Sequence, residues 1–115
     1  MKRVLIGELG GIVTLGLREL IHNDDGCRIV GEPCPPANVL EEITEHRPDV
    51  VLLDLDDSQR SRETATAIIS AHPAVKVIAC SSSEPRMRVF PPFHRGESYI
   101  ARMSPEQLID ALKTN

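Results

Sequence analysis

Short runs of aliphatic residues recur along the chain, separated by longer stretches in which apolar residues follow helical spacing. The runs are VLI at 4–6, RIV at 28–30, VVLL at 50–53, VKVIA at 75–79 and YIA at 99–101. Each run is too short for a helix and rich in β-branched residues, so we predict five strands. Because their hydrophobicity is continuous rather than alternating, we expect both faces of the sheet to be buried.

Four stretches with helical spacing predict helices between and after these strands. The first helix ends at the turn sequence NDDG. Asn38 and Glu41 have the spacing of a capping box for the second helix, and Ser104 and Gln107 have it for the last. The predicted inward residues are Val13, Leu17, Leu20 and Ile21, then Val39, Leu40 and Ile43, then Ala65, Ile68 and Ile69, and finally Leu108, Ile109 and Leu112.

Strand and helix therefore alternate along the whole chain. Buried strands in this order predict a parallel sheet with helices on both faces. Right-handed crossovers then favour a doubly wound α/β fold. In such a fold the functional site lies beyond the carboxyl ends of the strands. Residues that follow the predicted strands are therefore the candidates for a site.

Length and composition narrow the class of protein. The chain of 115 residues has the length of one domain, which we take as 1–115. A net charge of −4 without a block of Lys or Arg leaves no electrostatic footprint for nucleic acid. No apolar run approaches the ~20 residues of a membrane span, and Glu8 interrupts the apolar start too early for a signal peptide. Three cysteines without CxxC spacing favour reduced thiols in a cytoplasmic protein.

Acidic residues cluster where the third aliphatic run ends. The stretch PDVVLLDLDD at 48–57 places Asp54 at the tip of the strand, followed by Asp56 and Asp57. A carboxylate nucleophile, a hydroxyl and a cation brought together at one edge would form a phosphoryl-transfer site. The neighbouring strand ends supply Glu8 and Leu9 after the first strand, Ser81 and Ser82 after the fourth, and Arg102 at the end of the fifth.

Four segments carry a family resemblance: VLIGELGGIVTLGLREL, HRPDVVLLDL, VKVIACSS and YIARMSPEQLIDAL. Together they resemble the receiver domains of NarL/FixJ-type bacterial response regulators, over essentially the whole chain. The resemblance implies a flavodoxin-like sheet of five parallel strands in the order 2-1-3-4-5. It implies that Asp54 accepts a phosphoryl group from a histidine kinase in a two-component phosphorelay. The other implied residues are Ser81 as the pocket hydroxyl and switch, Tyr99 as the aromatic switch, and Glu8, Asp54 and Asp56 as ligands of Mg²⁺.

The chain departs from this pattern in the pocket. Leu9 stands where the family has a second acidic residue that binds Mg²⁺, and Mg²⁺ requires near-octahedral oxygen coordination. We therefore expect Mg²⁺ binding to be weak or absent, and we expect no other cofactor. Arg102 replaces the family's lysine with a planar fork of donors. We hypothesise that Arg102 pairs with Asp54 or Glu8 and balances their charge without a metal.

The region of the family's fourth helix also departs. It reads EPRMRVFPPFHRGES at 84–98, and Pro91 and Pro92 remove two backbone donors. Because a proline inside a helix costs about 3 kcal/mol, we predict that the fourth helix is short, displaced or absent. The resemblance implies an output surface made of the fourth helix, fifth strand and fifth helix, so that surface is altered here.

These features predict an atypical receiver domain, which is a non-enzymatic signalling module of a bacterial transcriptional regulator. Phosphorylation at Asp54 is expected to be weak or absent. The alternatives are a conventional phospho-accepting receiver, a domain that responds to a small-molecule ligand or partner protein, and a stand-alone protein-binding adaptor. A nucleotide-binding protein is disfavoured because Leu9 breaks the glycine fingerprint in GELGG.

The expected partners are a second copy of the chain, through the first and fifth helices, and a histidine kinase. DNA would be contacted only by a domain outside this chain, and no membrane is expected.

Overall fold

The computed structural model of the chain describes residues 2–7, 11–31, 38–54, 58–81, 86–92 and 98–113, and for 11–15, 54 and 58–62 it describes the backbone only. Every strand and helix predicted from the aliphatic runs and helical spacing is present. The elements in chain order are β1 (Lys2–Ile6), α1 (Gly11–His22), β2 (Cys27–Ile29), α2 (Val39–His46), β3 (Val50–Asp54), α3 (Ser58–Ala71), β4 (Lys76–Cys80), β5 (Arg86–Phe90), β6 (Tyr99–Arg102) and α4 (Pro105–Lys113).

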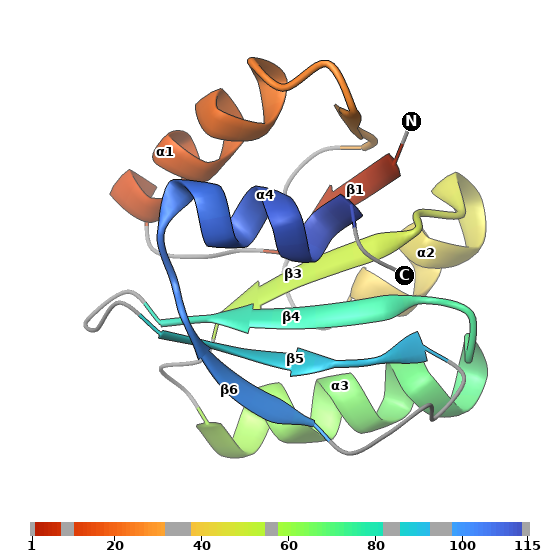
Figure 1. Cartoon of the computed structure of the whole chain (residues 1–115). Coiled ribbons are helices and arrows are strands. Elements are labelled where there is room, and N and C mark those ends of the chain that lie inside the picture. The colour runs from red at the N-terminus through yellow and green to blue at the C-terminus, as the bar shows by residue number, and fades with distance from the viewer. Residues whose placement is uncertain are drawn as a thin grey trace.

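The strands form one sheet of six in the order β2-β1-β3-β4-β5-β6 (Figure 1). The four strands from β2 to β4 are mutually parallel, while β5 is antiparallel to both β4 and β6. The doubly wound α/β class is therefore confirmed. The predicted count of five strands is corrected to six, because β5 separates β4 from the strand that was expected to be its neighbour.

The strand β5 occupies part of the region where a disrupted fourth helix was predicted. Its side chains alternate: Met87 is 2% exposed and Val89 is fully buried, while Arg86 is exposed and Arg88 half-buried. This period of two is typical of a strand with one buried face. The backbone groups of the segment pair with β4 on one side and β6 on the other, so a strand satisfies them without a helix.

Helices cover both faces of the sheet and enclose two cores. Figure 1 shows α1 and α4 on one side of the sheet and α3 on the other. Side chains of α1 and α4 share a core with Val50, Leu52, Ile78 and Cys80. Side chains of α2 and α3 share the second core with the alternate residues of the same strands, including Val51 and Leu53. No helix in the described ranges is long and apolar enough to span a membrane.

The ends of the helices confirm one of the two predicted caps. The backbone N–H of Gln107 donates to Ser104 Oγ at 3.2 Å, so Ser104 caps α4 as expected. Asn38 lies at the cap position of α2, but its side chain makes no capping hydrogen bond. Leu40, predicted to face inward, is exposed. At the other end of α2, the C-cap residue is Arg47, which adopts the left-handed conformation with φ of 48°.

Two lysines hold the C-terminal end of α4 in place. Lys76 is buried at the start of β4, and its Nζ donates to the carbonyl oxygen of Ala111 at 2.5 Å. Burial lowers the pKa of Lys76, with a smaller lowering from the charge of Lys2 and an opposing effect from Asp110. Lys113 forms an ion pair with Asp24 after α1, with Nζ and Oδ2 2.9 Å apart. The last turn of α4 is therefore tied to both the sheet and the α1–β2 turn.

Candidate functional site

The carboxyl ends of β1, β3 and β4 meet at one edge of the sheet. Residue Asp54 is the last of β3 and pairs with Cys80, the last of β4. At the end of β1, the backbone N–H of Gly7 donates to the carbonyl oxygen of Leu52 at 2.8 Å. Parallel strands place their ends together in this way, so the backbone positions of Gly7, Asp54 and Ser81 lie along the same edge.

Gly7 lets β1 and β3 approach closely just before the first candidate site residue. A Cβ atom at this position would lie 3.0 Å from the carbonyl oxygen of Leu52 and 3.2 Å from Leu53 Cδ2. The first of these neighbours is backbone and cannot rotate away. A side chain at position 7 would therefore require β1 or β3 to shift by a few tenths of an ångström just before Glu8 and Asp54.

Ser81 is the candidate hydroxyl that the structure describes most fully. It follows β4 directly and is buried. Its backbone N–H donates to the carbonyl oxygen of Arg86 at 3.1 Å, which starts the pairing between β4 and β5. Ser81 is therefore both the residue after the fourth strand, as predicted, and the first residue of the connection to an antiparallel neighbour.

Arg102 lies farther from Asp54 than the resemblance implies. The register matches Asp54 with Cys80, Cys80 with Met87, and Met87 with Ala101. Neighbouring strands are about 4.8 Å apart, so the backbones of β3 and β6 are separated by about 14 Å across β4 and β5. Because Ala101 packs against the core under α1 and α4, the alternation of side chains puts Arg102 on the opposite face, toward α3. The prediction that the cation lies in the strand next to that of Ser81 is therefore wrong.

Tyr99 begins β6 and lies opposite Val89, which in turn pairs with Ile78. It is therefore two residues nearer the amino ends of the parallel strands than the row of Asp54. Its side chain is 50% exposed.

Some candidate site residues lie outside the described residues: Glu8, Leu9, Asp56, Asp57 and Ser82. The side chain of Asp54 also lies outside them. Their roles stay predictions.

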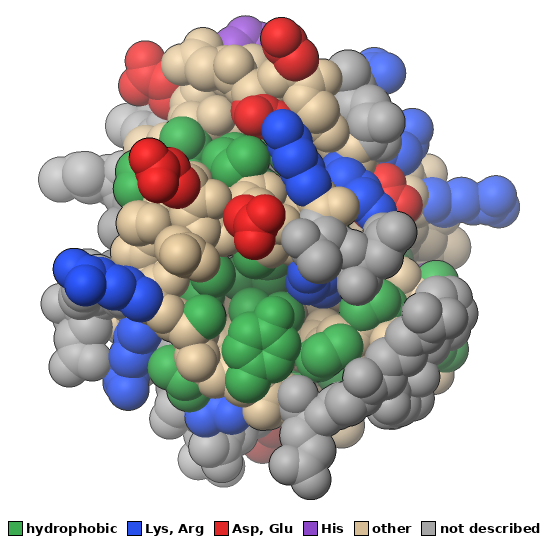
Figure 2. Space-filling view, viewed as in Figure 1, with side chains coloured by type: hydrophobic (Ala, Val, Ile, Leu, Met, Phe, Trp, Pro, Cys, Tyr) green, Lys and Arg blue, Asp and Glu red, His purple; other side chains and the backbone are tan. Residues whose placement is uncertain are grey.

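An arginine-bearing face of β5 and β6 was missed by the sequence analysis. Arg86 pairs directly with Arg102, and Arg88 pairs with Ile100, so all four side chains share the face toward α3. Nη1 of Arg88 donates to Ser98 Oγ at 3.1 Å. The signal was the alternating RMRV of 86–89, which predicts a half-buried strand. Figure 2, seen from the side of β6 as in Figure 1, shows hydrophobic side chains gathered below α4, with Lys and Arg side chains around them.

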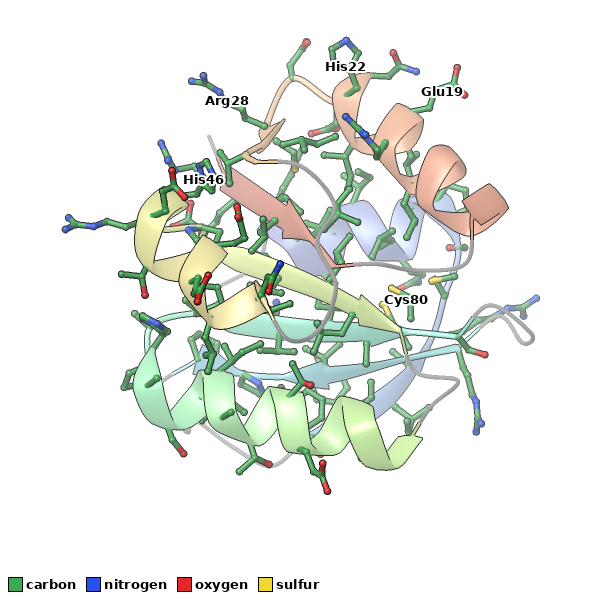
Figure 3. The ribbon with its side chains drawn as sticks, turned by 180° about the vertical axis from the view of Figure 1, so that it is seen from behind. Glu19, His22, Arg28, His46 and Cys80 are labelled. Carbon is green, nitrogen blue, oxygen red and sulfur yellow. The ribbon has the colours of Figure 1, made fainter. Side chains whose placement is uncertain are left out.

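A second group of possible metal ligands lies at the other end of the sheet. Single ligand atoms of Glu42, Glu45 and His46 lie within 4.8 Å of one another on α2, and His46 Nε2 is 3.1 Å from Glu42 Oε2. The carbonyl oxygen of His46 accepts a hydrogen bond from Arg3 near the start of β1. Figure 3 shows His46 and Cys80 at opposite ends of the sheet, so this group is separate from the edge of Asp54. Its i, i+3, i+4 spacing was readable from the sequence.

Comparison with known proteins gives relatives of one kind. The chain is 29% identical over 85 residues to the response regulator GacA of Pseudomonas viridiflava, covering 73% of this chain and 40% of that protein. It is 28% identical over 116 aligned residues to the oxygen regulatory protein NreC of Staphylococcus epidermidis, covering 97% and 53%. It is 27% identical over 114 residues to the transcriptional regulatory protein YxjL of Bacillus subtilis, covering 96% and 52%. No protein-family model matches the chain. The chain thus spans about half the length of the relatives it matches.

Proposed function

We propose that this chain, a receiver domain related to the NarL/FixJ-type response regulators, acts as a cytoplasmic, non-enzymatic signalling module of a bacterial transcriptional regulator. The observation that carries the proposal is the position of Asp54 at the carboxyl end of the central strand β3. In a doubly wound sheet this edge is where a ligand or a transferred group is bound. The relatives include one named as a response regulator and one named as a transcriptional regulatory protein, which supports the same assignment.

We further propose that Mg²⁺-dependent phosphorylation of Asp54 is weak. Leu9 offers no oxygen where the family has a metal ligand, and because Mg²⁺ is usually held by only one or two carboxylates, the loss of one weakens its binding. Because β5 lies beside β4, Arg102 on β6 is one strand farther from β3 than the family pattern implies. An ion pair between Arg102 and Asp54 is therefore not part of the proposal, because β4 and β5 lie between them.

The proposal is tested by incubating the chain with acetyl phosphate and Mg²⁺ and measuring its intact mass. Phosphorylation adds about 80 Da, and we expect little of this species in the native chain. Leu9→Asp restores a carboxylate ligand and should raise the phosphorylated fraction, whereas Leu9→Val, which adds no oxygen, should not. A fully phosphorylated native chain, with the added mass lost in Asp54→Ala, would identify a conventional receiver instead. No gain in Leu9→Asp would reject the missing ligand as the cause.

Output is proposed to use a homodimer through α1 and α4, with a histidine kinase as the upstream partner and DNA contacted by a separate domain. An apolar groove with a volume of about 370 Å³ between the two helices supports this interface. Its lining residues are Gly16, Leu17, Leu20, Met103, Ser104, Pro105 and Leu108. A Cβ atom at Gly16 would meet no atom within 4 Å, so a side chain can start at this position, and Gly16→Glu adds a charge beside the groove. Light scattering should show a dimer for the native chain and for Gly16→Ala but a monomer for Gly16→Glu. Dimers in all three would place the interface elsewhere.

A further inference from the structure

We propose that β6 is a docking edge for an extended acidic segment of a partner protein, which adds to the sheet as a further strand. Within the described part of the chain, β6 is the last strand of the sheet, so its outer backbone groups face away from β5. An open edge of this kind pairs readily with an extended peptide. The inference goes beyond the proposed function, because it does not depend on phosphorylation of Asp54.

Exposed hydrophobic side chains mark this edge. Three large hydrophobic residues in the described ranges are exposed, and two of them are neighbours in β6: Tyr99 at 50% and Ile100 at 47%. Because side chains alternate across a strand, Tyr99 and Ile100 lie on opposite faces of the sheet. A strand added beside β6 would therefore lie next to an exposed apolar side chain on each face of the sheet, Tyr99 on one and Ile100 on the other. This arrangement suits a peptide backbone that lies along the edge rather than a globular surface that covers one face.

The charge of the partner follows from the arginine face. Arg102 is exposed at the end of β6, and Arg86 lies directly opposite it on the same face. A carboxylate placed beside Arg102 can accept two parallel hydrogen bonds from its guanidinium. Arg88 adds a third positive charge two residues away on the same face. The added strand should therefore carry acidic side chains toward α3 and apolar side chains on its other face, next to Tyr99.

Two other occupants fit the edge less well. A nucleic acid would use the arginines but would leave the peptide donors and acceptors of β6 without matching partners. A second copy of the chain that paired through its own β6 would bring a second Arg102 to the edge instead of a carboxylate. Both remain as distinguishable outcomes of the test. An edge of four residues makes a small contact, so we expect weak, reversible binding.

The test is fluorescence anisotropy with a labelled peptide of about eight residues in which Val and Glu alternate, a typical strand length. The native chain should bind it, and Arg102→Glu should weaken binding by about tenfold or more because it places like charges together. Arg28→Glu is the matched control, since Arg28 is exposed on β2 at the opposite edge of the same sheet. It makes the same change of charge and should leave binding within about twofold if long-range electrostatics are screened. Equal losses in both variants would overturn the proposal.

Peptide variants test the strand geometry directly. A strand added to an edge uses the N–H groups of alternate residues, so N-methylation of one alternate set should abolish binding and N-methylation of the other should not. A peptide in which Lys replaces Glu should not bind. Equal binding of both N-methylated peptides, or of the Lys peptide, would reject strand addition by an acidic segment. Tighter binding of a single-stranded oligonucleotide, or self-association lost in Arg102→Glu, would assign the edge to nucleic acid or to a second copy instead.

Discussion

Replacement of Met87 by alanine tests whether the segment before β6 is a buried strand. Met87 is 2% exposed and packs in the core shared by α1 and α4, on the face of β5 opposite to Arg86. Truncating a buried methionine to alanine removes about 2–5 kcal/mol of unfolding free energy, so we take about 3 kcal/mol for this site. For a domain of about this size, that loss lowers Tm by roughly 12 °C.

The assay is urea unfolding followed by far-ultraviolet circular dichroism, repeated across neighbouring positions. Val89→Ala should also be costly, because Val89 is fully buried on the same face. Arg86→Ala should change the unfolding free energy by less than about 0.5 kcal/mol, since its side chain is exposed. In a helix, residues 87 and 89 would lie on nearly opposite faces and could not both be buried. Equal effects at 86 and 87, or a cost at only one of 87 and 89, would refute the strand.

Two further predictions concern α1 and the turn that follows it. Gly16→Ala should raise the unfolding free energy by about 0.5–1 kcal/mol, because alanine favours the helix and its Cβ meets no atom within 4 Å; a lower urea midpoint would contradict this. The hydrogen bond from Lys113 holds the pKa of Asp24 below its usual value of 3.8, so this carboxylate stabilises the fold above pH 3.8 and the effect is lost as pH falls through the lowered pKa. In Asp24→Asn, the unfolding free energy should therefore fall less steeply as the pH is lowered below 3.8. Thermal unfolding measured across pH tests this, and an equal pH dependence in the native chain and the variant would assign the acid loss of stability to other groups.

The inserted strand is the clearest case in which local pattern alone was insufficient. The prolines at 91 and 92 predicted a short, displaced or absent helix, and the described residues 86–90 of this region form a strand. The segment MRV at 87–89 carried the alternation of a half-buried strand. Whether such a segment pairs, and with which neighbour, depends on backbone partners that lie far away in the chain. Arg88, for example, pairs with Ile100 and with Ala79, which are brought together only by the sheet.

The helix caps show the same limit at a smaller scale. Ser104 and Asn38 both precede helices with a suitable residue three positions later, yet only Ser104 accepts the expected hydrogen bond. At the candidate site, position along the chain placed Asp54 and Ser81 at strand ends correctly. It did not reveal that Arg102 would be moved one strand farther out.

The order of residues by itself determined the alternation of strands and helices, the burial of the central strands and the position of Asp54 at a strand end. These properties depend on hydrophobic periodicity and helix ends, which are local. Tertiary structure decided that β5 lies between β4 and β6, that Arg86 faces Arg102, and that Tyr99 and Ile100 lie on an open edge. The physical reason is that a strand's hydrogen-bond partners are supplied by other segments, so its neighbours are set only when the whole sheet is assembled.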